Sequence, residues 1–227
     1  MMQTSATIGR QLAWAERRPA IRQVADELTG GASPTVERWF DELQLPMPIA
    51  RPVVRADDVQ PERNRALWRY WSSLRCGQSL PRIDQIEPVD MRDLLGTVIL
   101  SDIIDDGFDV RYRVFGSMLT QQTSVEMTGR RLSDLIPRLG TSPAGVMLTA
   151  AVNLRVVADR QPWYSEHAPP LHITTSGWKR LVLPLTDGTG RIVRLLQGVV
   201  PATRASMTHS GRSVLSRRVV VRGRARR

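Results

Sequence analysis

Hydrophobic and polar positions alternate in the middle of the chain, around an acidic turn. An apolar run, Val98 to Ile104, ends at Asp105-Asp106-Gly107. In the next segment, residues 108–114, apolar side chains fall on one face and charged side chains on the other. Segments of this kind on either side of an Asp-Gly turn predict a β-hairpin.

A second hairpin is predicted near the end of the chain. Residues 177–185 and 191–200 are two strand segments joined by the turn Asp187-Gly188-Thr189-Gly190. A further strand opens at residues 161–164, and residues 142–159 have apolar positions at helical spacing, which predicts a long helix with one buried face. This order of helices and strands predicts an α+β fold with an antiparallel sheet.

A helix is also predicted from Pro61 to Cys76, ahead of the first hairpin. Its apolar face is wide and carries Trp68, Tyr70 and Trp71 within four residues. We interpret these aromatic residues as docking the helix on the core rather than as a platform for a ligand. The preceding residues 45–54 contain three prolines and are predicted to be an extended linker.

The first 54 residues carry the pattern of two short helices around a glycine-containing turn, which fits a helix-turn-helix. Pro19 is expected in the first turn of one helix, and Ser33-Pro34 is expected to cap the other. The segment 21–43 resembles the N-terminal helix-turn-helix of KfrA-type plasmid DNA-binding proteins. The matching residues are Val24, Leu28, Gly30, Gly31, Ser33, Thr35, Val36 and Trp39.

That resemblance implies DNA contacts from the second helix, for which Thr35 and Arg38 are the candidates. DNA-reading helices normally bring a basic surface, whereas Arg38 here stands among Glu37, Asp41 and Glu42. A purely structural helical hairpin and a fortuitous pattern therefore stay open as alternatives.

The net charge of +10 is concentrated at the end of the chain. Residues 204–227 contain eight Arg and no acidic residue. We expect a disordered basic tail there, which can attract phosphates or acidic surfaces. The predicted organisation is a helical extension at 1–54, a domain at 58–203 and this tail.

One cysteine, Cys76, excludes an intramolecular disulfide and suits a reducing compartment. The first residues lack the long apolar segment of a signal peptide, and no stretch approaches the ~20 apolar residues that span a bilayer. A cytoplasmic protein without membrane contact is therefore expected.

From residue 62 to about 203 the chain resembles a family of single PAS-domain proteins found in bacteria. The motifs that carry the resemblance are Tyr70-Trp71-x-x-Leu74-Arg75-x-Gly77-x-x-Leu80-Pro81, Ile86-Glu87-Pro88, Leu94-Leu95, Arg111-Tyr112-Arg113-Val114-x-Gly116, Met127-Thr128-Gly129-Arg130 and Leu181 to Leu185 with Asp187-Gly188. The resemblance implies a five-stranded antiparallel sheet with helices on one face. It also implies signal sensing, and contact with a protein partner or a second copy.

The residues that usually bind the known cofactors of PAS domains are missing from the expected positions. The expected long helix has neither His nor Cys for a haem, and Cys76 stands outside the Asn-Cys-Arg motif of photoactive flavin domains. His167 and His172 have no third metal ligand at a recognised spacing and are expected in a surface loop. No cofactor or metal is therefore predicted.

The function expected from these patterns is a non-enzymatic sensor or interaction module. No catalytic triad or phosphate-binding glycine loop stands in a recognisable context. A small apolar ligand would meet the candidate cavity residues Tyr112, Met118, Leu119 and Met127, although the same residues suit a filled core. The main alternative is a DNA-binding regulator that uses residues 19–44 and dimerises through the PAS domain.

Overall fold

The computed structural model describes residues 13–136, 143–169 and 175–202. Its centre is an antiparallel sheet of six strands in the order β1-β4-β5-β6-β2-β3. The strands are β1 (Ile49–Pro52), β2 (Val98–Ile104), β3 (Asp109–Phe115), β4 (Trp163–His167), β5 (Gly177–Thr186) and β6 (Ile192–Ala202). The five strands expected from the sequence are all present, and β1 adds a sixth.

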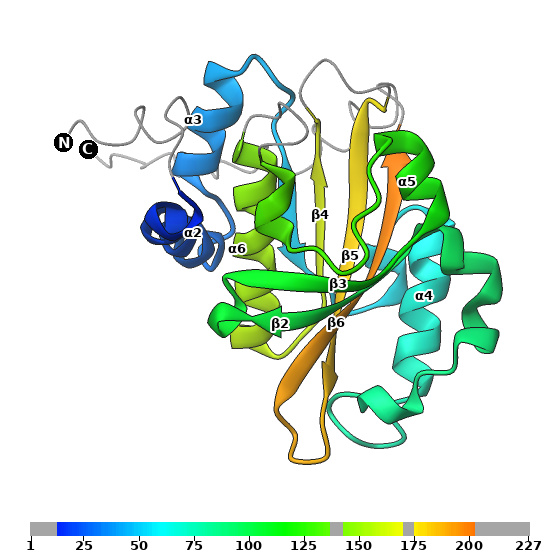
Figure 1. Cartoon of the computed structure of the whole chain (residues 1–227). Helices are drawn as coiled ribbons and strands as arrows, with labels where there is room; N and C mark the ends of the chain where they lie inside the picture. The colour runs from blue at the N-terminus through cyan, green and yellow to red at the C-terminus, as the bar shows by residue number, and fades with distance from the viewer. Residues whose placement is uncertain (1–12, 137–142, 170–174, 203–227) are drawn as a thin grey trace, which may run out of the picture.

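Helices lie on both faces of the sheet, so the expectation of one covered face was incomplete. The α-helices are α2 (Trp14–Leu28), α3 (Pro34–Glu42), α4 (Glu62–Ser73), α5 (Ser117–Thr123) and α6 (Pro143–Asp159). The 3-10 segments are η1 (Ala56–Asp58), η2 (Ile83–Gln85), η3 (Pro88–Thr97), η4 (Asp105–Gly107) and η5 (Leu132–Leu135). In Figure 1, α6 and α4 lie on opposite sides of the sheet; we call the α6 side the inner face and the α4 side the outer face.

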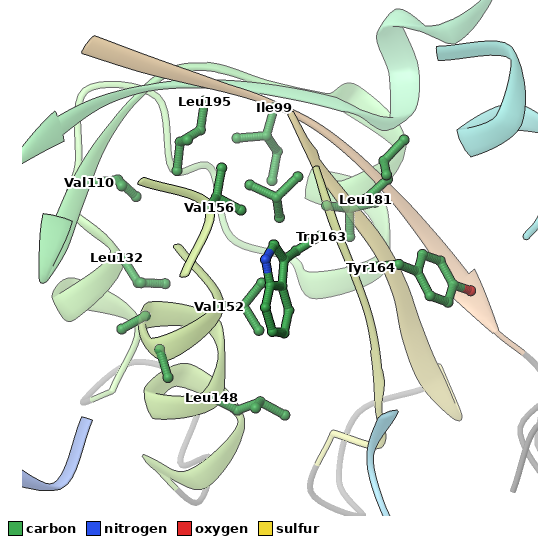
Figure 2. Close-up of a cluster of buried hydrophobic side chains, with 14 of the residues drawn as sticks. Ile99, Val110, Leu132, Leu148, Val152, Val156, Trp163, Tyr164, Leu181 and Leu195 are labelled. Carbon is green, nitrogen blue, oxygen red and sulfur yellow. The ribbon is translucent and has the colours of Figure 1, made fainter. Parts of the chain in front are cut away.

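The alternation of side chains along the strands supplies a core to each face. Trp163 of β4 points toward Val152 of α6, whereas the next residue, Tyr164, points to the other side (Figure 2). Both aromatic residues are buried. Successive strand residues face opposite ways, so a sheet covered on both faces needs apolar residues at nearly every position.

The two hairpins expected from turn chemistry are confirmed. Asp105, Asp106 and Gly107 all have positive φ between β2 and β3, the backbone conformation that Asp tolerates and Gly favours. Between β5 and β6, the Asp187 carboxylate accepts hydrogen bonds from the backbone N–H groups of Thr189 (2.9 Å) and Arg191 (3.0 Å).

The proline-rich segment that the sequence predicts as a linker contains strand β1. Its residues pair with β4, and Arg51 lies opposite Tyr164 with its guanidinium 5.5 Å from the ring centroid. Pro52 is tolerated because β1 is an edge strand, where a residue without an N–H leaves no ladder bond unmade. The segment therefore belongs to the sheet.

The N-terminal helices pack on the rest of the molecule. Ser33 caps α3 as predicted, its hydroxyl accepting from the Val36 N–H at 3.3 Å. Pro19 does not open a helix, because α2 begins at Trp14 and includes Pro19 in its interior. Helix α2 lies against α6, where Arg17 contacts the Met147 sulfur at 3.8 Å.

No helix in residues 13–136, 143–169 and 175–202 is long and apolar enough to cross a membrane. The predicted basic tail and His172 lie outside the residues that the structure describes.

Candidate functional site

A cavity of about 90 Å³ lies between the inner face of the sheet and the first turns of α6. At the roughly 10–15 Å³ that one water needs, this volume holds on the order of six to nine water-sized groups. Its described lining is Ile99, Tyr112, Phe115, Leu119, Thr123, Leu132, Leu135, Gly145, Val146, Thr149, His167, Ala168, Pro169, Trp178, Arg180 and Val199. Most of these residues are apolar. Thr123 and Thr149 add hydroxyl groups, and Tyr112, His167 and Arg180 add groups that can titrate.

Strand register brings the polar groups of the cavity together on the inner face. His167 of β4 lies opposite Trp178 of β5, and two residues further along β5 is Arg180. Arg180 is in turn opposite Val199 of β6. Residues two apart on a strand share a face, so His167 and Arg180 both meet the cavity.

Burial dominates the electrostatics of these groups. Arg180 is 8% exposed and its Nε has no hydrogen-bond partner. Loss of hydration lowers the pKa of this guanidinium, an effect that Tyr112 opposes. Burial raises the pKa of Tyr112 to about 12, so its hydroxyl stays protonated at neutral pH and can donate a hydrogen bond.

His167 is neutral at physiological pH. Burial, with the nearby positive charge of Arg180, lowers its pKa to about 3. Its Nδ1 has no hydrogen-bond partner. Gly145 of α6 allows the close approach of this ring, since a Cβ at that position would lie 3.1 Å from His167 Cδ2. The imidazole is thus held against α6 with one ring nitrogen available.

Two of the four predicted cavity residues line this cavity. Tyr112 and Leu119 do, each 1% exposed. Met127 is fully buried but is not part of the lining. Met118 is 38% exposed and lies against Gly96 instead, so the expectation that it faces the cavity was wrong. In a helix as short as α5, neighbouring residues face different ways and the sequence does not mark which one is buried.

The two predicted DNA-contact residues have different surroundings. Arg38 is exposed, but Thr35 is fully buried and its hydroxyl donates to the Glu27 carboxylate at 2.7 Å. The structure therefore contradicts the expectation that Thr35 is available to DNA. The resemblance did not reveal this because a polar residue early in a helix serves equally well as an internal hydrogen-bonding group.

The charged residues of the site were missed or misplaced by sequence reasoning. His167 was expected in a surface loop, but β4 continues through it and buries it. Arg180 was not singled out, although it alternates with the apolar residues Trp178 and Val182 on one face of β5.

The described residues contain no cluster of three His, Cys, Asp or Glu side chains that could hold a metal ion. Cys76 is exposed and is not part of the cavity lining.

Comparison with known proteins identifies the family to which this architecture corresponds. The family model described as "PAS domain" matches residues 59–199. Among solved structures, the "Structure of an RNA-binding Light-Oxygen-Voltage Receptor" is similar, with a TM-score of 0.44 and 12% sequence identity. That similarity covers 86% of this chain and 53% of the other chain, so this chain spans about half of that protein. The search of curated proteins finds no match.

Proposed function

The chain belongs to the PAS domain family, and from this premise we propose that it is a non-enzymatic sensor that binds a small molecule in the inner-face cavity. Ligand binding shifts the packing of the sheet, and α4 passes the change to a protein partner or a second copy. A ligand can do this only if it binds one packing more tightly than the other.

One observation carries this proposal: β5 joins the cavity directly to α4. Arg180 points into the cavity from the inner face. The carbonyl oxygen of the preceding residue, Lys179, accepts a 3.1 Å hydrogen bond from the Asn64 side chain of α4 on the outer face. A shift of β5 around a ligand therefore moves an atom to which α4 is bonded.

Helix α4 has a second attachment to the same strand. The Trp71 indole N–H donates to the Pro184 carbonyl oxygen at 2.9 Å. Asn64, Leu67 and Trp71 form the buried side of α4, and the opposite side carries the exposed residues Glu62 and Arg69. The helix thus has one side fixed to β5 and one side available to a partner.

The test is native mass spectrometry of the purified full chain, compared with the same sample after denaturation. We expect an additional small-molecule mass in the native spectrum that is absent after denaturation. Gly145→Val, which fills the cavity beside His167, should abolish that mass, whereas Gly188→Ala in an open turn should keep it. A native mass equal to that of the bare chain, together with no thermal stabilisation by any member of a metabolite library, would contradict ligand sensing.

DNA binding through residues 19–44 stays a prediction, supported by the exposed side chain of Arg38. Its test is salt-dependent duplex binding by the full chain and by Arg38→Ala. Loss of affinity in the variant at constant salt would support a contact from α3, since each phosphate contact contributes to the salt dependence. Equal affinity would reject it.

A further inference from the structure

Arg180 is a buried cation for which the chain supplies no carboxylate. Residues 1–12, 137–142, 170–174 and 203–227 contain neither Asp nor Glu, so every acidic side chain falls within the described residues. The ion pairs in that part of the chain do not involve Arg180. Burying a charge costs free energy unless the charge is paired. An anion from outside the chain would therefore be stabilised beside this guanidinium.

The other buried cation on β5, Lys179, is paired with a carboxylate of the chain. Lys179 points to the outer face, where its ammonium lies 3.5 Å from the Glu166 carboxylate. Arg180, one residue further, points to the cavity, where Tyr112 partly opposes the lowering of its pKa and where its own charge lowers the pKa of His167. The two faces of β5 thus differ. On the outer face Lys179 is paired with Glu166, whereas on the inner face Arg180 borders the cavity.

We propose that the cavity binds a small monocarboxylic acid with an apolar body, whose carboxylate pairs with the Arg180 guanidinium. This inference rests on the proposed ligand-binding function and names its ligand class. A planar guanidinium matches a carboxylate in geometry and binds it through two parallel hydrogen bonds. The Tyr112 hydroxyl and the neutral His167 ring are further donors near the same position.

The rest of the lining defines the body of the ligand. Away from Arg180 most of the cavity surface is apolar, and the Thr123 and Thr149 hydroxyls are neutral. The apolar side chains include those of Ile99, Leu119, Leu132, Val146 and Val199. One cation with no internal carboxylate favours a single negative charge, because a second carboxylate would be buried among these apolar groups without a partner. The volume of about 90 Å³ suits a short branched aliphatic acid or a single aromatic ring, not a fatty acid with a long chain.

Benzoate is a suitable probe, with the neutral benzamide of nearly equal shape as its control. Titration of the full chain, followed by ¹H–¹⁵N NMR of the Arg Nε–H groups, measures affinity and reports on Arg180 itself. We expect benzoate to shift the Arg180 Nε–H resonance and to bind at least about tenfold more tightly than benzamide, as the loss of a charge-assisted hydrogen bond implies. Arg180→Met should remove this preference, and Arg191→Met on the exposed β5–β6 turn should retain it.

The binding data separate a failure of the carboxylate inference from a failure of the proposed ligand binding. Equal affinity for benzoate and benzamide, or benzoate binding that survives Arg180→Met, would overturn the carboxylate inference and leave ligand binding in the cavity intact. Absence of binding by both probes up to their solubility would overturn the inference and count against the proposed function as well. If Arg180→Met does not fold, Arg180→Lys keeps the charge without the planar fork and is expected to weaken benzoate while leaving benzamide unchanged.

Discussion

The side chain of Asn64 and the backbone of Lys179 are joined by a buried hydrogen bond of 3.1 Å. The bond connects α4 to the centre of the sheet at the residue next to Arg180. Gly198 of the adjacent strand makes room for it, since a Cβ there would overlap Asn64 Oδ1 and lie 3.0 Å from Leu67 Cδ2. The position of α4 on the outer face therefore depends on a residue without a side chain.

Gly198→Ala should displace α4 from the sheet. The added methyl group cannot fit without breaking the Asn64–Lys179 bond or moving the helix, and overpacking of this kind costs about 1–3 kcal/mol. Urea denaturation measures the loss of unfolding free energy, and hydrogen exchange should show faster exchange in α4. Gly188→Ala, whose Cβ meets nothing within 4 Å, is the matched control and should stay within about 0.5 kcal/mol of wild type. Equal stability of the two variants would refute the close approach.

Trp71→Ala should destabilise the protein far more than substitutions on the exposed side of the same helix. Trp71 is 1% exposed and its indole N–H is bonded to Pro184. Removing a buried Trp costs about 3–5 kcal/mol, and the measurement is the unfolding free energy in urea. Arg69→Ala is the control, because its ion pair with Glu62 is exposed on both sides and such pairs contribute about 0–1 kcal/mol. Wild-type stability in Trp71→Ala would show that α4 does not dock through this residue.

Features encoded by neighbouring residues could be predicted from the sequence. The turns at 105–107 and 187–190 depend on residues that accept positive φ or bond to their own backbone, so the two hairpins were predicted correctly. The Ser33 cap depends on residues only three positions apart. The docking side of α4 followed from the spacing of its apolar residues. In each case the information lies within a few residues.

Features that depend on distant contacts were missed. Strand β1 exists because β4 offers an unpaired edge more than 100 residues later, which the local prolines hide. His167 and Arg180 are buried because α6 covers the inner face there, although their types favour the surface. The alternation of Arg180 with Trp178 and Val182 was the available sign that a charge faces the core. For Leu119 and Met118, only the packing of α5 decides which of the two is buried.

Glu27→Gln should loosen the hairpin of α2 and α3. The Glu27 carboxylate accepts hydrogen bonds from the Ser33 hydroxyl at 2.6 Å and from the Thr35 N–H at 3.1 Å. Burial alone would raise the pKa of Glu27, but the bonds from Ser33, Thr35 and Gln23 outweigh it and hold that pKa below its ordinary value. Neutralising this acceptor should cost about 1–2 kcal/mol at pH 7. Asp26→Asn, at an exposed neighbouring position, should change the urea midpoint little; a similar loss in both variants would argue against a specific role for Glu27.

His167 should make the protein sensitive to mild acid. Its pKa in the folded state is about 3, lowered by burial and by Arg180, whereas in the unfolded chain it is about 6.5. Between these values the unfolded state binds more protons than the folded state, so stability falls as the pH falls. Above about pH 6.5 the group is neutral in both states and has no effect.

The expected loss of unfolding free energy depends on how far the pH of the measurement lies below 6.5. At pH 5 this single group should have reduced the unfolding free energy by about 2 kcal/mol relative to pH 7, at ~1.4 kcal/mol per unit. His167→Gln, which cannot titrate, should lose correspondingly less stability over the same range. Comparing the two proteins by urea denaturation at both pH values cancels the contributions of all other groups. An identical loss in wild type and variant would mean that His167 takes up a proton in the folded state as readily as in the unfolded chain, and would contradict its burial beside Arg180.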